Sequence, residues 1–323
     1  MSDSQQPIVL HDPYTTHIAN VFRHADMDTD KYPTITWDVY PDQMPKMIVK
    51  NQRQLAGRDV VLIASMCDCA NGFRVAMMLR HLSECNPMSL TLIVTAYMYG
   101  TDDRSDRPGM VVTAKHAIGI IEDSMRKAHG MRQRVFVIEP HTLQLLSFYQ
   151  GSMHRIDAMP TLLNTVLAQH KMSGHGGSLC VVMPDNGADK RYGSVVNEIA
   201  GLCKVVCNKT RQVDGTVTTT IAEDHRDVAS PISGYVIIDD LIRSGLTLIK
   251  CYDALRLLVG PDARFYVAAV HADFVGDAID AISRSGVDLF YITDSNRNAS
   301  DRVANNSKFV VLPCAAAIDL AKL

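Results

Sequence analysis

The stretch 234–248 places a strand pattern, an acidic pair, a turn of small residues and the start of a helix in immediate succession. Its apolar run, Tyr235 to Ile238, is too short for a helix and lies between Gly234 and two acids, Asp239 and Asp240. Such a run is typical of a fully buried parallel strand. The stretch therefore indicates an α/β protein.

The turn after the acidic pair has the chemistry of a phosphate site. Backbone N–H groups of the turn and of the first helical turn point at one spot, where the helix dipole adds partial positive charge. Ser244 and Thr247 can add hydroxyl hydrogen bonds. Asp239 and Asp240 then lie about one sugar's length away, where they can accept ribose hydroxyls or hold a cation. The alternative is an ordinary strand–helix turn with solvated acids.

Strand and helix patterns alternate along most of the chain, which predicts parallel sheets with helices on both faces. The Gly-rich connector 173–177 predicts a domain boundary. We therefore expect two tandem doubly wound domains, residues 1–172 and 173–323, with the last helix packing back on the first domain. The expected strands are 8–10, 34–40, 47–50, 59–64, 90–95, 135–138, 179–183, 204–207, 236–238, 265–270, 289–292 and 309–312. The expected helices include 73–81, 113–128 and 161–169.

Composition and charge exclude several function classes. A net charge of -3 and a sequence pI near 6.4 argue against a general nucleic-acid binder. No apolar run approaches membrane-spanning length and the first residues lack signal-peptide character, so we expect no membrane partner and a cytoplasmic location. The eight cysteines have no finger-like spacing and are interpreted as reduced structural thiols.

The stretch 234–248 resembles the phosphoribosyl-diphosphate fingerprint shared by type I phosphoribosyltransferases and ribose-phosphate pyrophosphokinases, the PRPP synthetases. Lys209 and Arg211 leave a predicted strand together and enter a long polar loop. Because alternate residues of an extended chain project to one side, both cations can point at one anion. The pair resembles the catalytic flexible loop of PRPP synthetases, which favours the pyrophosphokinase over the transferase. The implied fold is phosphoribosyltransferase-like in both domains.

Two further segments resemble this family. Asp185 lies in a P-D-x-G-x-x-K-R-like segment that borders the ribose phosphate and metal, and Glu139 and His141 match a D-x-H pattern at a strand end. The resemblance implies Mg²⁺ held by His141, Asp185 and Glu139. It also implies catalytic roles for Lys209, Arg211 and His141.

Other segments are similar to the plant-type, phosphate-independent class. Residues 40–45 resemble its F-x-D-G-F-P loop, residues 100–104 its G-S-x-E-R segment, and residues 291–295 its W-I-T-D-S segment. The resemblance implies an ATP site between subunits of a homo-oligomer. Its nucleotide-binding residues would be Tyr40, Asp42, Thr101, Asp102 and Arg104.

The resemblance implies Mg²⁺-dependent diphosphoryl transfer from ATP to ribose 5-phosphate in nucleotide biosynthesis, giving PRPP and AMP. The turn departs from the family at Leu246, where the family has Gly, and at Arg243, where it has an acid or a small polar residue. An alternative acceptor is therefore a ribose 5-phosphate ester such as ADP-ribose, and a catalytically silent regulatory subunit is a third reading. The implied sugar-phosphate residues are Asp185, Asp239, Asp240, Arg243, Ser244, Gly245, Leu246 and Thr247.

Overall fold

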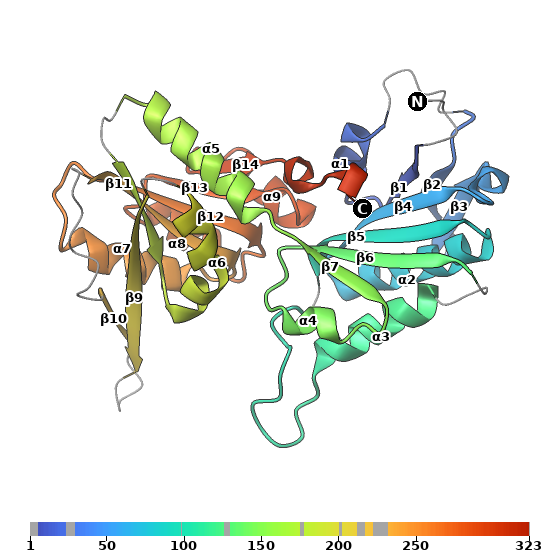
Figure 1. Ribbon diagram of the computed structural model, residues 1–323, viewed down its shortest axis with the longest axis horizontal. Helices are drawn as coiled ribbons and strands as arrows, with labels where there is room; N and C mark the ends of the chain where they lie inside the picture. Colours follow the sequence, from blue (N-terminus) through green and yellow to red (C-terminus); the bar gives the residue numbers. More distant parts are fainter. Residues whose placement is uncertain are drawn as a thin grey trace. The chain divides into compact units, whose positions relative to one another are not determined.

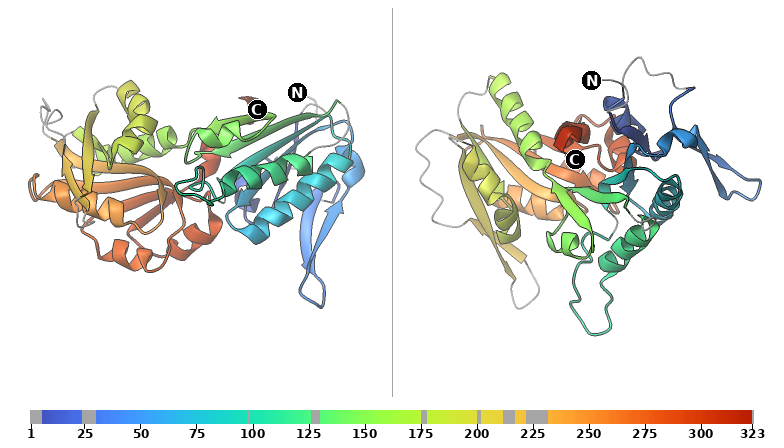
Figure 2. Two further views of the ribbon diagram at one scale, coloured as in Figure 1. Left: turned by 90° about the horizontal axis from the view of Figure 1, so that it is seen from below. Right: turned by 45° about the vertical axis from the view of Figure 1, so that its right-hand side comes forward.

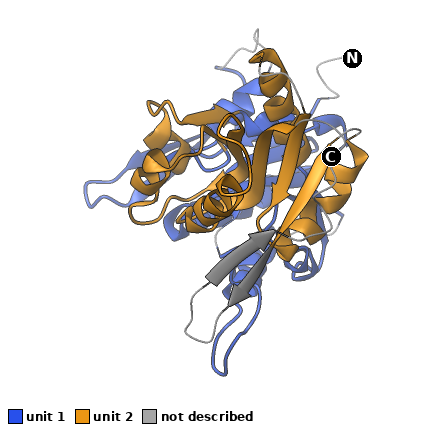
Figure 3. Ribbon diagram, turned by 90° about the vertical axis from the view of Figure 1, so that its left-hand side faces the viewer, with its two compact units in different colours: residues 1–157, 295–298, 313–323 blue, residues 158–294, 299–312 orange. Residues whose placement is uncertain are grey.

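The computed structural model describes residues 6–23, 30–97, 99–125, 130–174, 178–199, 202–211, 217–221 and 232–322. The chain forms two compact units, shown in Figure 3. Unit 1 comprises residues 1–157, 295–298 and 313–323, and unit 2 comprises residues 158–294 and 299–312. Each unit has its own hydrophobic core, and each is built around one sheet.

Unit 1 is built on a five-stranded parallel sheet in the order β1-β4-β5-β6-β7 (Figure 1). Parallel strands need crossover connections, which are usually helices. One of these helices, α2, begins at Asp68, whose side chain accepts a hydrogen bond from the Asn71 N–H at 2.7 Å. The bounds are β1 (Ile8–His11), α1 (Thr16–Val21), β4 (Asp59–Met66), α2 (Cys69–Glu84), β5 (Ser89–Tyr97), α3 (Thr113–Met125), β6 (Arg132–Ile138), α4 (Gln144–Ser147) and β7 (Ser152–Ile156).

A separate antiparallel hairpin in unit 1 consists of β2 (Thr34–Val39) and β3 (Pro45–Lys50). It extends away from the five-stranded sheet (Figure 2). A short 3-10 helix near the end of the chain, Cys314–Ala317, contacts α1 and returns the C-terminal segment to unit 1. The segment 295–298 also belongs to unit 1, since the buried Thr95 hydroxyl donates to the Ser295 carbonyl at 2.8 Å.

Unit 2 has a seven-stranded sheet in the order β10-β9-β8-β11-β12-β13-β14. All neighbouring strands are parallel except β10, which is antiparallel to β9. This α/β architecture confirms the predicted fold class. The bounds are α5 (Met159–Met172), β8 (Ser178–Met183), α6 (Asn186–Glu198), β9 (Cys203–Arg211), β10 (Val217–Ile221), β11 (Ile232–Ile242), α7 (Leu246–Arg256), β12 (Arg264–Ala272), α8 (Ala278–Arg284), β13 (Leu289–Thr293), α9 (Arg297–Val303) and β14 (Phe309–Leu312).

The chain passes from unit 1 to unit 2 between Asp157 and Ala158, before the boundary expected at 172/173. The difference arises from α5, which packs on β12 and β13 of unit 2. Its Gln169 side chain accepts a hydrogen bond from the Tyr291 hydroxyl at 2.8 Å. The Gly-rich connector therefore follows a helix that already belongs to unit 2.

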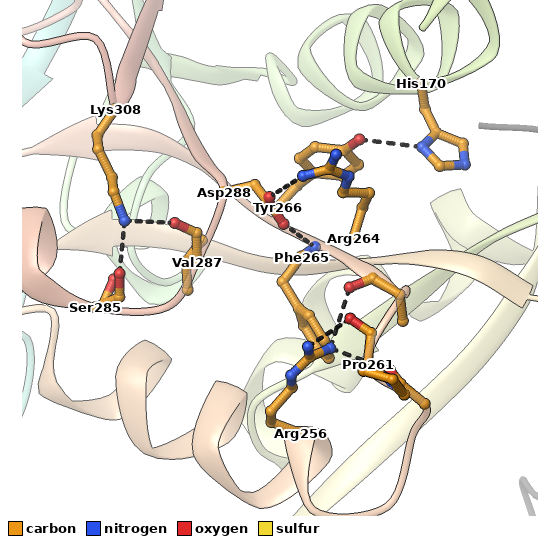
Figure 4. Close-up of polar contacts among 12 residues, drawn as sticks. His170, Arg256, Pro261, Arg264, Phe265, Tyr266, Ser285, Val287, Asp288 and Lys308 are labelled. Carbon is orange, nitrogen blue, oxygen red and sulfur yellow. Dashed lines mark hydrogen bonds and ion pairs between the residues drawn. The ribbon is translucent and has the colours of Figure 1, made fainter. Parts of the chain in front are cut away.

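Polar contacts hold together the amino-terminal edge of the unit 2 sheet (Figure 4). Arg264, at the start of β12, forms an ion pair with Asp288 at 2.7 Å. The Lys308 ammonium donates to the carbonyls of Ser285 and Val287 at 2.5 and 2.8 Å. The acidic pair, Asp239 and Asp240, lies near the opposite, carboxyl edge of the sheet.

Candidate active site

Gly245 separates β11 from α7 and forms the turn of the predicted phosphate site. Its φ of 72° is left-handed, a conformation that L side chains rarely adopt. A Cβ atom at this position would lie 2.9 Å from Ile282 Cγ1. The turn therefore requires glycine, and Gly245 offers the helix no side-chain cap. As at other helix starts, the first backbone N–H groups of α7 have no acceptor within the helix, and such groups can bind anions.

The residues around this turn differ in their hydrogen bonds and in their exposure. Ser244 Oγ accepts a hydrogen bond from the Leu246 N–H at 3.4 Å, and the Arg243 carbonyl accepts one from the Val275 N–H at 3.0 Å. Leu246 is 55% exposed. Within the described part of the chain, the exposed Arg243 guanidinium has no hydrogen bond or ion pair. An apolar side chain and a cation thus border the turn.

The acidic pair lies within β11 and not after it, because this strand continues to Ile242. The Asp240 N–H donates to Asp239 Oδ1 at 2.9 Å. Burial raises the pKa of Asp239 well above its usual value, and the nearby carboxylates of Asp240 and Asp185 raise this pKa further. The three predicted carboxylates of unit 2 therefore lie close enough to interact.

Asp185 reaches the acidic pair because β8 is the parallel neighbour of β11, with Val182 opposite Ile237. The Asp185 side chain caps α6, and its Oδ1 accepts hydrogen bonds from the N–H groups of Gly187 and Ala188, each at 3.0 Å. The cap fixes this carboxyl group at the carboxyl edge of the sheet, where ligands of open α/β sheets bind.

Arg191 was not among the predicted site residues, yet it forms an ion pair with Asp240. The side chains of Arg191 and Asp240 are 18% and 4% exposed. Burial opposes the charge of Arg191, but the Asp240 carboxylate raises the pKa of the guanidinium above its usual value. The available sequence signal was the basic pair Lys190-Arg191 soon after the capping acid.

The predicted catalytic cations, Lys209 and Arg211, lie in the last residues of β9, where the backbone pairs with β10. Strand structure thus extends past Cys207, where a loop was expected. The side chains of Lys209 and Arg211 lie outside the described part of the chain, as do residues 212–216 and 222–231. Their catalytic roles stay predictions.

In unit 1 the structure brings two predicted segments together. Glu139, which is buried with a φ of 41°, and His141 follow β6. A Cβ atom on Gly100 would lie 3.9 Å from His141 Cβ, so the segment 100–104 passes beside this histidine. In that segment the buried acid is Asp103, which pairs with Arg104 at 3.3 Å.

Thr101 and Asp102 lie in the same segment, which leads from β5 to α3. The Asp102 backbone accepts a hydrogen bond from the Ala114 N–H at 3.3 Å. Thr101 is exposed. The contacts of Thr101 and Asp102 with the nucleotide stay predictions.

Tyr40 and Asp42 lie in the turn of the β2–β3 hairpin. Tyr40 is 48% exposed, and the Lys46 ammonium lies 5.4 Å from the centre of its ring. Asp42 Oδ1 accepts a hydrogen bond from the Met44 N–H at 3.1 Å. Both residues thus lie at the tip of the hairpin, which extends away from the unit 1 sheet (Figure 2).

Among the described residues, no group of three or more His, Cys, Asp or Glu side chains is arranged to hold a metal ion. Mg²⁺ usually binds through one or two carboxylates, several waters and substrate phosphates. None of the helices in the described part of the chain is long and apolar enough to span a bilayer.

No protein-family model matches the chain. Curated relatives include the ribose-phosphate pyrophosphokinase of Streptomyces coelicolor, 28% identical over 79% of this chain and 75% of the relative. Ribose-phosphate pyrophosphokinase 4 of Oryza sativa is 25% identical over 91% of this chain and 89% of the relative. Ribose-phosphate pyrophosphokinase 3, chloroplastic, of Arabidopsis thaliana is 24% identical over 91% and 70%.

Among solved structures, the phosphoribosylpyrophosphate synthetase from Mycobacterium smegmatis has a TM-score of 0.76 and 17% identity. The match covers 97% of this chain and 96% of that chain, so the two share a fold. The relatives confirm the resemblance seen in the motifs and the enzyme class that it implies. The plant-type class has only weak support, since the bacterial relative is at least as similar as the plant ones.

Proposed function

We propose that this relative of the ribose-phosphate pyrophosphokinases transfers the β,γ-diphosphoryl group of ATP to the anomeric hydroxyl of ribose 5-phosphate. One observation carries the proposal: the Gly245 turn and the start of α7 lie at the same carboxyl edge of the unit 2 sheet as Asp185, Asp239 and Asp240. A phosphate bound by the turn would place its sugar beside these carboxylates.

In the proposed reaction the anomeric oxygen attacks the β-phosphorus of ATP and loses its proton. The bond from the β-phosphorus to the oxygen that bridges it to the α-phosphorus breaks, and AMP leaves. Such a transfer depends mainly on positioning and on stabilisation of charge. Lys209 as a point charge and Arg211 as a planar fork would stabilise the transferring group, and His141 would act beside the nucleotide phosphates.

Mg²⁺ is the proposed metal. Its candidate ligands are His141 and Glu139 in unit 1 and Asp185 in unit 2, each acting together with substrate phosphates. The carboxylate oxygens suit this ion, which prefers oxygen ligands. When bound, Mg²⁺ would neutralise charge on the phosphates.

For ATP we propose a site that includes Thr101, Asp102 and Arg104, with Tyr40 and Asp42 supplied by a neighbouring subunit of a homo-oligomer. Support comes from the exposed ring of Tyr40 on the extended hairpin and from the passage of the segment 100–104 beside His141. An adenine ring could stack on Tyr40.

A second acceptor, a ribose 5-phosphate ester such as ADP-ribose, is favoured by the residues that border the turn. Leu246 is largely exposed, and the exposed Arg243 guanidinium has no polar partner among the described residues. These side chains could receive the nucleoside and the extra phosphate of the ester.

The test is release of AMP from ATP with Mg²⁺, run in parallel with ribose 5-phosphate and with ADP-ribose, each repeated with excess EDTA. We expect AMP with ribose 5-phosphate and none with EDTA. AMP formed only with ADP-ribose would mean that ADP-ribose, and not ribose 5-phosphate, is the acceptor. No AMP with either acceptor would contradict both proposals and favour a regulatory subunit.

A further inference from the structure

The two carboxylates of the acidic pair leave β11 in different directions. Successive residues of a strand point to opposite faces of the sheet, so Asp239 and Asp240 are not equivalent. Asp240 meets Arg191 of α6, a helix that contacts both β8 and β11. A buried carboxylate needs such a partner, because an isolated buried charge is strongly unfavourable.

Arg191 also lies against an aromatic ring. Its guanidinium carbon lies 5.7 Å from the centre of the ring of Tyr192, which is buried. The same helix begins at the Asp185 cap. One helix, α6, therefore carries the Asp185 carboxyl group at its start and the partner of Asp240 in its second turn.

We propose that Arg191 is a positioning residue for the acceptor site, and this inference rests on the proposed function. Its guanidinium fixes the orientation in which Asp240 meets the sugar hydroxyls. It also ties the start of α6, with Asp185, to the end of β11. Three carboxylates at one edge repel one another, and the Arg191 cation holds one of them in a defined place. The planar fork of Arg does this better than the point charge of Lys.

The test compares Arg191→Met and Arg191→Lys with the wild type. We expect Arg191→Met to raise KM for ribose 5-phosphate by about tenfold to a hundredfold, because a small misplacement of a binding group has effects of this size. KM for ATP should stay near the wild-type value. Arg191→Lys keeps the charge without the fork, and its KM for ribose 5-phosphate should be intermediate.

The matched control is Arg264→Met, which breaks another Arg–Asp pair of unit 2 at the opposite edge of the sheet (Figure 4). We expect it to leave KM for ribose 5-phosphate unchanged. In an Asp240→Asn background, Arg191→Met should raise KM little further, because residues that act as a unit are not additive. Additive effects would contradict action through Asp240.

Hydrogen exchange measured by mass spectrometry gives a result that does not depend on turnover. Arg191→Met should exchange faster at residues 185–189 and 239–243, and Arg264→Met should not. Wild-type KM and wild-type exchange in Arg191→Met would overturn the inference. If Arg191→Met does not fold, the same values in Arg191→Lys would overturn it. Absence of AMP release from the wild type would contradict the proposed function, while exchange would still decide the positioning role.

Discussion

Lys209 is the residue whose loss we expect to reduce turnover most. Lys209→Ala removes a point charge from the transferring diphosphoryl group. Loss of one such electrostatic contact lowers kcat by about 10²–10³-fold. The measurement is AMP release at saturating ATP and ribose 5-phosphate, together with a urea unfolding curve that should match the wild type. Near-normal turnover would remove the catalytic assignment of Lys209.

Lys204 provides the control for this variant, because it lies on the same strand. Its ammonium pairs with Asp189 at 2.9 Å and is partly exposed. A partly exposed pair contributes only about 0–1 kcal/mol, so Lys204→Ala should retain kcat and lose little stability. A large loss of kcat in Lys204→Ala would mean that β9 tolerates no change, and would weaken the reading of Lys209→Ala.

The sequence predicts that the carboxyl groups lie at one edge of the sheet, but it does not predict that Arg191 pairs with Asp240. Asp185 and Asp239 follow patterns of buried parallel strands, and neighbouring parallel strands end at the same edge of a sheet. Arg191 is different, because the rotation of α6 against β11 decides whether Lys190 or Arg191 faces the acidic pair. That rotation depends on packing between segments far apart in the chain.

Gly245 determines whether the turn between β11 and α7 can form. Gly245→Ala must adopt a left-handed φ and place its Cβ atom 2.9 Å from Ile282 Cγ1. We expect a loss of about 1–3 kcal/mol in the free energy of unfolding, the usual range for such strain. The distorted turn should also bind ribose 5-phosphate more weakly. Urea unfolding and calorimetric titration with ribose 5-phosphate measure the two effects.

Gly260→Ala is the matched control, because a Cβ atom there would meet no atom within 4 Å. It should bind ribose 5-phosphate like the wild type. Equal affinity and equal stability of Gly245→Ala and Gly260→Ala would show that the turn does not need glycine.

Elements were predictable where the apolar pattern reports burial, and less so where polar residues are buried in pairs. The expected strand 236–238 is the centre of β11, which continues through Asp240 to Ile242. The acids interrupt the apolar pattern, and the sequence does not reveal that Arg191 neutralises one of them. Similarly, β9 continues past Cys207 because β10 pairs with it.

The presence of two α/β units was predictable, because strand and helix patterns alternate in both halves of the chain. Its position was not, because a Gly-rich connector marks a turn and not necessarily a boundary. The connector after Met172 separates α5 from β8, which both belong to unit 2. Contacts between α5 and the strands β12 and β13 decide this membership, and those strands lie far along the chain.

The two boundaries make different predictions for fragments of the chain. Residues 158–312 retain α5, whereas residues 173–312 lose it and expose the surface that it covers. The helix buries Met159, Leu162, Leu163 and Val166. Burial of such side chains contributes about 1.5–3 kcal/mol each, and a whole domain is stable by only about 5–15 kcal/mol. We therefore expect cooperative urea unfolding for 158–312 and none for 173–312. Equal unfolding midpoints for both fragments would contradict the assignment of α5 to unit 2.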